Sequence, residues 1–362
     1  MKTHRHILAD ASLPHLASLF NPFFSLTLYH NEDELKNNIR SHDILLCRTT
    51  QRIDASLLEG ARLQCIASAS SGTDHIDHAF LQKQEINLFD AKGCNATAVV
   101  DYILSSMAYL RLFHGITGRR IGIMGVGYVG RELARRLNAI DFDVRCFDPL
   151  RAQRDHTFKS CTLDDLTHCD FISVHANLHL DPPFPSWHLL NAERIQALRP
   201  KVILNASRGQ IVDETALLEA SCNLLYCTDV YTDEPRINPL IIERATLCTP
   251  HIAGHSLEAK HNAVRIISEK LHQHYGIPLP KTARQAQPNL PWPLHLPRGT
   301  WEETLLHLYN PLHETEQLKK AASPQDIFLP LRQAHQTRHD LTCYTNEGLD
   351  RMTQRVMGVG IT

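Results

Sequence analysis

Three short segments each place one reactive side chain directly after an apolar run. They are "NASRG" with Arg208, "DVYTDEP" with Glu234 and "TPHIAG" with His251. An arginine presents a planar fork of donors that suits a carboxylate, which makes Arg208 the candidate clamp for an acidic substrate. An imidazole exchanges a proton near neutral pH, because its unperturbed pKa is about 6.5. A cation, a carboxylate and an imidazole in this order would suit proton transfer on a small carboxylic acid.

A glycine-rich loop in "IGIMGVGYVGRELARRL" is typical of a dinucleotide site. Gly125, Gly127 and Gly130 form the G-x-G-x-x-G pattern between an apolar run and a helical pattern. The first glycine permits a tight turn, the second lets the backbone approach a pyrophosphate, and the third lets the helix pack on the strand. The start of the helix also favours an anion. We therefore predict that this loop, including Tyr128 and Val129, binds a dinucleotide.

The choice between NAD and NADP depends on Asp148, which ends the next apolar run 18 residues after Gly130. A carboxylate there accepts hydrogen bonds from the adenosine ribose and repels a 2′-phosphate, so NAD is the predicted cofactor. Arg151 and Arg154 follow closely and could reach a 2′-phosphate. If Asp148 is only a turn residue before Pro149, the choice of cofactor stays open.

The elements that must position these residues are six apolar runs that begin at Arg120. They read "RIGIMG", "DVRCFD", "DFISVHAN", "KVILNASRG", "LLYCTDV" and "ATLCTPHIAG". Strands that alternate with helices or long loops predict right-handed crossovers and one parallel, doubly wound sheet. Ligands bind at the carboxyl ends of such strands, where Asp148, Arg208, Glu234 and His251 all stand.

A smaller α/β layer is predicted in the first hundred residues from "HILAD", "DILLCR" and "QCIASAS". Two long helical patterns, one after Asn95 that stops at Gly115 and one that stops at Gly276, predict helices that join the two layers. A boundary follows, with six prolines in the 23 residues 277–299. Beyond it, "TWEETLLHLYNPL" and "PQDIFLPLRQAHQ" predict helices, and "LTCYT" and "RVMGVGIT" predict strands.

The predicted fold is therefore α/β in three parts. Residues 1–95 and 257–280 form a flavodoxin-like substrate domain, and residues 96–256 form a Rossmann-type NAD-binding domain. Residues 281–362 form a small α+β domain. We hypothesise that this last part serves dimerisation, because so small a core tends to be stabilised by association.

The composition disfavours several classes of protein, including nucleic-acid-binding, membrane and zinc proteins. Lysine and arginine total 37 against 39 acidic residues, which disfavours a nucleic-acid partner. No stretch approaches the roughly eighteen apolar residues of a membrane span, and the start lacks the apolar run of a signal peptide, so a cytoplasmic protein is expected. The ten cysteines never form C-x-x-C, and several lie inside apolar runs. They are expected to be free buried thiols rather than zinc ligands or disulfides, and no metal is implied.

The combination of "GVGYVG", "NASRGQIVDETAL", "DVYTDEP" and "TPHIAG" resembles the D-isomer-specific 2-hydroxyacid dehydrogenases, over roughly residues 1–280. Within that family the resemblance is closest to members that act on a phosphorylated four-carbon acid in the vitamin B6 pathway. The supporting stretches are "CRTTQRIDASLL", "SGTDHIDHAF", "KGCNATAVVDYILSS", "HIAGHSLEAK", "LLHLYNPLHETEQLKKA" and "LRQAHQTRHDLTCY".

This resemblance implies roles for individual residues. The family's catalytic arginine, glutamate and histidine fall on Arg208, Glu234 and His251. His251 would then be the acid/base for the substrate hydroxyl, Glu234 would stabilise its protonated form and fix its tautomer, and Arg208 would hold the carboxylate and carbonyl. The implied cofactor contacts are Ala176, Ala206, Ser207, Arg208, Asp229 and Gly254.

Substrate contacts are implied at Thr49 and Ser70, and His255 stands where the closest relatives tend to carry tyrosine. A substrate phosphate needs cations. Arg48, at a strand end, is one candidate, although it could equally be a solvated strand terminus. Arg332 or Arg338 of the C-terminal extension could reach the phosphate across a dimer interface, although a role as ordinary surface residues is the favoured interpretation for them.

Two other functions remain open from the residues. One is a dehydrogenase for another acid, such as 3-phosphoglycerate, with the C-terminal part as a regulatory module that binds an amino acid. The other is a dehydrogenase-like corepressor that binds NAD to switch a protein interface. The intact set of Arg208, Glu234 and His251 argues against the corepressor.

Overall fold

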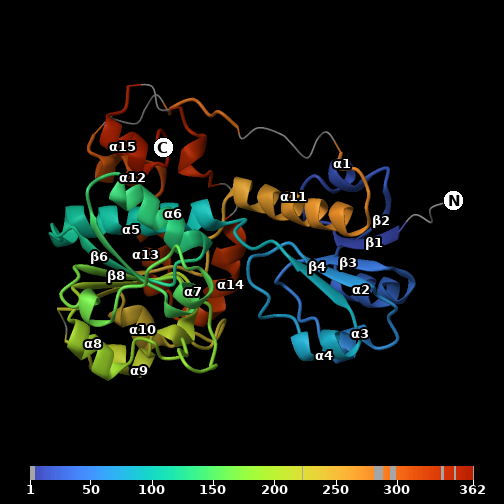
Figure 1. The fold of residues 1–362 in the computed structure, drawn as a ribbon, viewed down its shortest axis with the longest axis horizontal. Coiled ribbons are helices and arrows are strands. Elements are labelled where there is room, and N and C mark those ends of the chain that lie inside the picture. Colours follow the sequence, from blue (N-terminus) through green and yellow to red (C-terminus); the bar gives the residue numbers. More distant parts are fainter. Residues whose placement is uncertain are drawn as a thin grey trace. The chain divides into compact units, whose positions relative to one another are not determined.

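The computed structural model describes residues 5–221, 223–280, 288–293, 299–335, 338–345 and 348–361. The chain divides into two compact units (Figure 1). One unit combines the residues up to 95 with residues 256–288, and the other combines residues 96–255 with residues 289–362. Each unit is described by itself.

The first unit is built on a five-stranded parallel sheet of order β2-β1-β3-β4-β5. Its strands are β1 (Arg5–Asp10), β2 (Phe24–Tyr29), β3 (Ile44–Cys47), β4 (Cys65–Ser68) and β5 (Asn87–Asp90). Its helices are α1 (Leu16–Phe20), α2 (Glu32–Asn38), α3 (Ala55–Leu58), α4 (His78–Lys83) and α11 (Leu257–His274). This strand order is flavodoxin-like, which confirms the predicted fold of the substrate domain.

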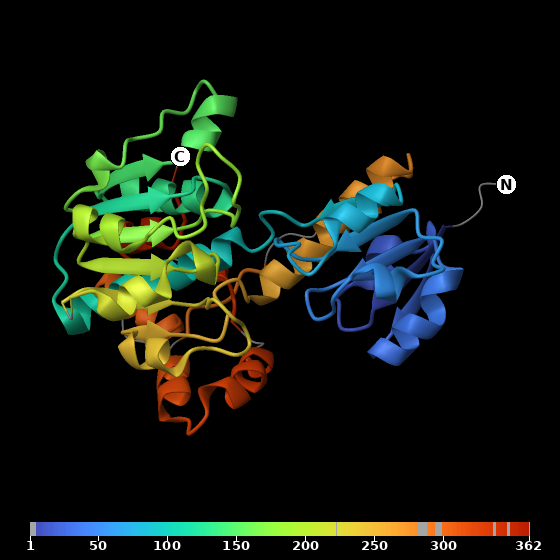
Figure 2. The same ribbon diagram turned by 90° about the horizontal axis from the view of Figure 1, so that it is seen from below.

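Alternate residues of these strands point to opposite faces of the first sheet. Ile7 and Ile44 pack with α1 and α11, whereas Leu8 and Leu45 pack in the cluster of α2, α3 and α4. Figure 2 shows α11, in orange, beside the blue strands that it covers. The helix begins after Ser256, whose hydroxyl accepts a hydrogen bond from the main-chain N–H of Ala259.

The second unit carries a six-stranded parallel sheet of order β11-β10-β9-β8-β6-β7. Its strands are β6 (Arg120–Met124), β7 (Asp143–Phe147), β8 (Phe171–Val174), β9 (Val202–Asn205), β10 (Leu225–Thr228) and β11 (Leu247–Cys248). All six predicted strands are confirmed. The chain leaves β6 to form β7 on one side and returns to form β8 on the other, so β6 and β8 flank the switch point where open α/β sheets bind ligands.

Helices cover both faces of this second sheet. They are α5 (Ala96–His114), α6 (Tyr128–Asn138), α8 (Ala192–Leu198), α9 (Glu214–Glu219) and α10 (Pro239–Arg244), whereas α7 (Pro149–Arg154), after β7, has no buried residue. The long helix α5 begins directly after Asn95 and ends before Gly115, as predicted. Among the described residues, no helix is both long enough and apolar enough to cross a membrane.

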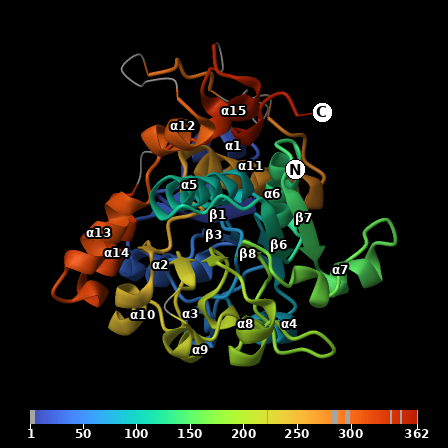
Figure 3. The same ribbon diagram turned by 90° about the vertical axis from the view of Figure 1, so that its left-hand side faces the viewer.

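The described residues of the C-terminal part are mainly helical and belong to the second unit. They form α12 (Trp301–Leu308), α13 (Leu312–Lys320), α14 (Pro324–Ala334) and α15 (Arg351–Val356). Helix α12 contacts α5 and α15, and α13 contacts β11 (Figure 3). Two predicted strands were wrong: "LTCYT" contains a single 3-10 turn at Leu341–Cys343, and "RVMGVGIT" overlaps α15. Helix α15 forms because the Asp350 carboxylate accepts hydrogen bonds from two main-chain N–H groups at its start. Val356, its last residue, is buried.

Nine of the ten cysteines lie within the described residues, and all nine are free thiols. Cys222 lies outside the described residues.

Candidate active site

The three predicted catalytic residues stand on loops that follow neighbouring strands. Arg208 follows β9, Glu234 follows β10 and His251 follows β11, and these strands are adjacent in the sheet. The first two loops touch, because a Cβ added to Gly209 would lie 2.0 Å from the carbonyl carbon of Tyr231. The sheet therefore brings the three loops to one edge of the second unit.

Glu234 and His251 are joined directly. The Oε2 atom of Glu234 lies 2.5 Å from Nδ1 of His251, and Oε1 accepts a hydrogen bond of 2.9 Å from the main-chain N–H of Tyr231. Burial acts to raise the pKa of the Glu234 carboxyl, but His251, the Tyr231 amide and Arg332 outweigh it, so this pKa lies below its usual value. An ionised Glu234 fixes the His251 tautomer and leaves Nε2 for proton exchange with a substrate.

Asp229 holds the loop that carries His251. Its buried carboxylate accepts hydrogen bonds from the N–H groups of Ile252 (2.7 Å) and Ala253 (2.8 Å) and from the hydroxyl of Thr249 (2.7 Å). His251 itself has φ 57, a left-handed conformation that is costly outside glycine and persists only where its surroundings fix it. Asp229 was predicted as a cofactor contact, and the structure adds this role within the protein.

Arg208 stands at the end of a turn shaped by Asn205. The buried Asn205 side chain accepts hydrogen bonds from the N–H and hydroxyl of Ser207 and donates one of 3.0 Å to the carbonyl of Arg208. The Arg208 guanidinium donates to the Ser207 carbonyl at 2.8 Å. Ala206 lies in the same turn. The turn thus places a cation beside the loop of Glu234.

The glycine loop has the geometry that a pyrophosphate needs. Gly125 has φ +91, and a Cβ there would lie 2.4 Å from the main-chain nitrogen of Ala176, in the loop after β8. A Cβ on Gly130 would lie 2.2 Å from the Gly125 carbonyl oxygen. A Cβ on Gly127 would meet nothing within 4 Å, directly before the start of α6. The backbone is therefore open at the one glycine where an anion would approach the helix N-terminus.

The residues around Asp148 also fit NAD. Asp148 accepts hydrogen bonds from the N–H of Val126 (2.8 Å) and from the N–H of Arg151 (2.9 Å), and so caps α7. The Arg151 guanidinium donates to the Val126 carbonyl and to Asp155. It is therefore engaged within the protein, while Arg154 is exposed. Tyr128 is 56% exposed at the start of α6, and Val129 is partly buried.

The predicted substrate residues of the first unit lie at the carboxyl ends of its strands. Arg48 follows β3 and donates a hydrogen bond of 2.9 Å to Asp10, at the end of β1. Thr49 is exposed, and the Ser70 hydroxyl donates to the Gly72 carbonyl. Lys260 of α11 was missed. Its pKa lies below the usual value, because burial and, to a lesser extent, the charge of Arg48 disfavour its protonated form.

A lysine in the first turns of a helix opposes the helix dipole, and this signal in the sequence could have singled out Lys260.

Arg332 and Arg338, the two arginines considered for the substrate phosphate, interact with residues of their own chain. Arg338 donates hydrogen bonds to the carbonyls of Ala253 and His255, and Arg332 lowers the pKa of Glu234. The His255 ring lies 6.4 Å from the ring of His335 at the end of α14. Gly254 lies in the same loop, between Ala253 and His255.

Comparisons with known proteins agree with this arrangement. Residues 106–253 match the family model "D-isomer specific 2-hydroxyacid dehydrogenase, NAD binding domain". An "Erythronate-4-phosphate dehydrogenase" from Legionella pneumophila (strain Lens) is 50% identical over 340 residues, which are 94% of this chain and 96% of the relative. A protein of the same name from Coxiella burnetii (strain RSA 331 / Henzerling II) is 34% identical over 345 residues, 93% of each chain.

Solved structures share the fold. The NAD+-bound 3-phosphoglycerate dehydrogenase of Entamoeba histolytica aligns with a TM-score of 0.62 and 19% identity, over 75% of this chain and 96% of its own. The D-mandelate dehydrogenase of Rhodotorula graminis aligns with a TM-score of 0.63 and 19% identity, over 76% and 96%. The chain therefore belongs to the D-isomer specific 2-hydroxyacid dehydrogenase family and is an NAD-dependent oxidoreductase.

Proposed function

We propose that the chain oxidises 4-phospho-D-erythronate to 2-oxo-3-hydroxy-4-phosphobutanoate with NAD, a step of pyridoxal 5′-phosphate (vitamin B6) biosynthesis. The hydrogen-bonded pair of Glu234 and His251 carries the reaction type, because it pairs a base with its orienting carboxylate. The 50% identity to a relative with a matching name supports the substrate.

In this mechanism Nε2 of His251 accepts the proton of the 2-hydroxyl group, and the C2–H bond breaks as its electrons leave with the hydrogen. NAD supplies the hydride acceptor when it is bound. Glu234 stabilises the imidazolium that forms, and Arg208 holds the substrate carboxylate and the developing carbonyl. The proton on His251 then returns to solvent.

We assign NAD contacts to the loops at the carboxyl edge of the second sheet. Gly127 would let the pyrophosphate reach the N-terminus of α6, and Asp148 would accept the ribose hydroxyls. The full proposed set is Gly125, Gly127, Tyr128, Val129, Gly130, Asp148, Ala176, Ala206, Ser207, Arg208, Asp229 and Gly254.

For the substrate phosphate we propose Arg48 together with Lys260. Arg48 stands at the carboxyl end of β3, where it pairs with Asp10, and its charge together with burial lowers the pKa of Lys260, which indicates repulsion between the two cations. A dianionic phosphate would relieve that repulsion. Thr49, Ser70 and His255 are proposed to contact the rest of the substrate.

We also propose a cytoplasmic homodimer formed through residues 281–362. The nine free thiols of the described residues suit a reducing compartment. Exposed apolar side chains in this C-terminal part, including Leu329 and Met352, would favour association. Sedimentation tests this part, and a stable monomer would contradict it.

The substrate is tested by turnover with 4-phospho-D-erythronate, 3-phosphoglycerate and D-lactate side by side. We expect a clear preference for the first. Preference for either of the others would identify another 2-hydroxyacid dehydrogenase. No turnover with any of them, together with tight NAD binding, would favour the corepressor.

A further inference from the structure

We propose that Arg338 is a positioning residue. It lies in the C-terminal segment, residues 338–361, and holds the loop of residues 249–255, called the catalytic loop below, so that His251 faces its substrate. The proposal rests on the proposed role of His251 in proton transfer. It gives the extension a function inside the active site of its own chain.

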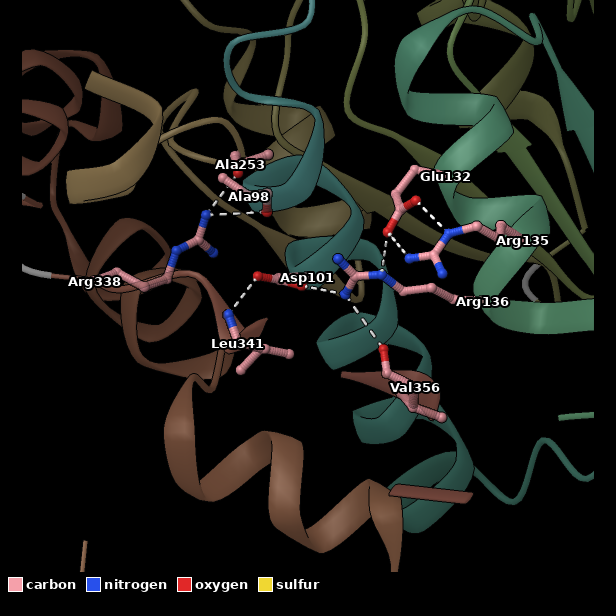
Figure 4. Close-up of polar contacts among 9 residues, drawn as sticks. All are labelled: Ala98, Asp101, Glu132, Arg135, Arg136, Ala253, Arg338, Leu341 and Val356. Carbon is pink, nitrogen blue, oxygen red and sulfur yellow. Dashed lines mark hydrogen bonds and ion pairs between the residues drawn. The ribbon is translucent and has the colours of Figure 1, made fainter. Parts of the chain in front are cut away.

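Arg338 donates hydrogen bonds to three main-chain carbonyls. Its Nη2 atom donates hydrogen bonds to the carbonyls of Ala253 (2.6 Å) and Ala98 (3.2 Å), and its Nε atom donates one of 3.0 Å to the carbonyl of His255. Figure 4 shows the bonds to Ala253 and Ala98. A guanidinium can make such bonds in several fixed directions at once, so one side chain ties the catalytic loop to the start of α5.

The catalytic loop is held from a second side by Asp229. Ala253, two residues after His251, donates its N–H to Asp229, and its carbonyl accepts from Arg338. The main-chain N–H and the main-chain carbonyl of Ala253 are thus each bound by a charged side chain. Since His251 has a left-handed backbone, its conformation depends on such contacts. Asp229 and Arg338 thus hold the loop from two sides, in addition to the contact of His251 with Glu234.

Arg338 is itself fixed on both sides. Its guanidinium lies over the ring of Tyr309, 4.4 Å from the centroid. Three residues later, the N–H of Leu341 donates a hydrogen bond of 2.8 Å to Asp101 on α5. Asp101 in turn accepts one of 2.6 Å from Arg136 on α6, the helix that begins at the glycine loop (Figure 4). The C-terminal segment therefore connects the catalytic loop with the helix of the cofactor site.

The experiment compares Arg338→Ala with wild type in kcat, in KM for 4-phospho-D-erythronate, and in NADH binding by fluorescence. We expect kcat to fall between about tenfold and about a hundredfold, as for a small misplacement of a reacting group. NADH affinity is expected to fall by much less than kcat, because the loop of Gly125 and Gly127 is not touched and, of the proposed cofactor contacts, only Gly254 lies between the two carbonyls of the catalytic loop that Arg338 binds. Added guanidinium ion is expected to restore part of kcat, and Arg338→Lys to keep part of it.

Arg355→Ala is the matched control. Arg355 is also a C-terminal arginine that donates to a main-chain carbonyl, that of Ala139 at 2.8 Å, but it does not touch the catalytic loop. We expect it to keep wild-type kcat. Equal losses of kcat in the two variants, or no response of Arg338→Ala to guanidinium, would show a general structural role and overturn the proposal.

The same assays separate this proposal from the one on which it rests. If His251→Asn keeps full turnover, the proton-transfer assignment fails. If His251→Asn is inactive while Arg338→Ala has wild-type kcat, only the positioning role fails. If Arg338→Ala does not fold, Arg338→Lys decides: a lowered kcat at an unchanged melting temperature supports the role, and a wild-type kcat overturns it.

Discussion

Glu234 on the loop after β10 binds Nδ1 of His251 on the loop after β11, with 2.5 Å between the two atoms. The carboxylate is largely buried, and its other oxygen is bound by a main-chain N–H. The pair is therefore built as an orienting contact, with the second ring nitrogen left for chemistry. The first two predictions follow from this contact.

Glu234→Gln is expected to lower kcat by about a hundredfold, at the low end of the range for general acid-base catalysis. Glutamine can accept the same hydrogen bond but carries no charge to stabilise the imidazolium. Steady-state turnover with NAD measures the effect, and Asp233→Asn, at the exposed neighbouring acid, is the control. An unchanged kcat in Glu234→Gln would contradict the assigned role.

Glu234 also links stability to pH. Its folded pKa lies below the ordinary value of 4.5, so its ionised form contributes stability that is present above that value and lost as the pH falls through the folded pKa. Urea unfolding should therefore show wild type more stable than Glu234→Gln at neutral pH. The difference should shrink as the pH is lowered below the ordinary glutamate value, and a difference that grows on acidification would contradict this account.

Two glycines of the cofactor loop should respond differently to alanine. Gly127→Ala is expected to leave the melting temperature unchanged, because its Cβ meets nothing within 4 Å, but to weaken NADH binding by about tenfold, or roughly 1.4 kcal/mol. Gly130→Ala is expected to lower the melting temperature, because its Cβ would lie 2.2 Å from a carbonyl oxygen. Equal effects of both changes on binding and stability would argue against a pyrophosphate at Gly127.

The buried ion pair of Asp101 and Arg136 should matter for stability. Asp101→Ala is expected to destabilise the chain by about 3–5 kcal/mol, the usual cost when one partner of a buried pair is removed. The reason is that Arg136 is fully buried and, among the described residues, only the partly buried Glu132 would remain to balance its charge. Urea denaturation measures the change. Lys36→Ala, which breaks the exposed pair with Glu32, should change little, and a similarly small effect of Asp101→Ala would be inconsistent with the structure.

The phosphate site is tested by Arg48→Ala and Lys260→Ala. Each should raise KM for 4-phospho-D-erythronate by between about tenfold and about a hundredfold, since a hydrogen bond to a charged group contributes about 1.5–3 kcal/mol. The ratio of the variant's KM to the wild-type KM should be smaller at high salt, because salt screens the attraction between the phosphate and these partly exposed cations. Lys83→Ala, an exposed lysine on α4, is the control. Unchanged KM values in both variants would show that other residues bind the substrate phosphate.

The sheets were largely predictable because their central strands are continuous apolar runs, such as "ILLC" in β3 and "VILN" in β9. The strands that the sequence did not reveal, β2 and β5, are the two edges of the first sheet. Edge strands are only partly buried, so "FSLTLY" and "NLFD" mix polar and apolar residues and look like loops. The predicted strand in "RVMGVGIT" failed for a related reason, since a short apolar run does not distinguish a strand from a capped helix.

Arg208, Glu234 and His251 were predictable because each is a reactive side chain that comes shortly after a predicted strand. Contacts made through the backbone were not predictable. Arg338 binds the carbonyl of Ala253, 85 residues earlier, and any side chain at position 253 would offer the same carbonyl. Asp229 likewise binds main-chain N–H groups of the next loop. Such partners become visible only when the folded chain brings the segments together.

If His251 moves the proton in the NAD-dependent oxidation, His251→Asn should stop most turnover and leave cofactor binding intact. Turnover of 4-phospho-D-erythronate and NADH binding would be measured on the same preparation. We expect a fall in kcat of about 10²- to 10⁴-fold, with NADH affinity nearly unchanged. Turnover close to wild type, or loss of NADH binding in step with activity, would contradict it.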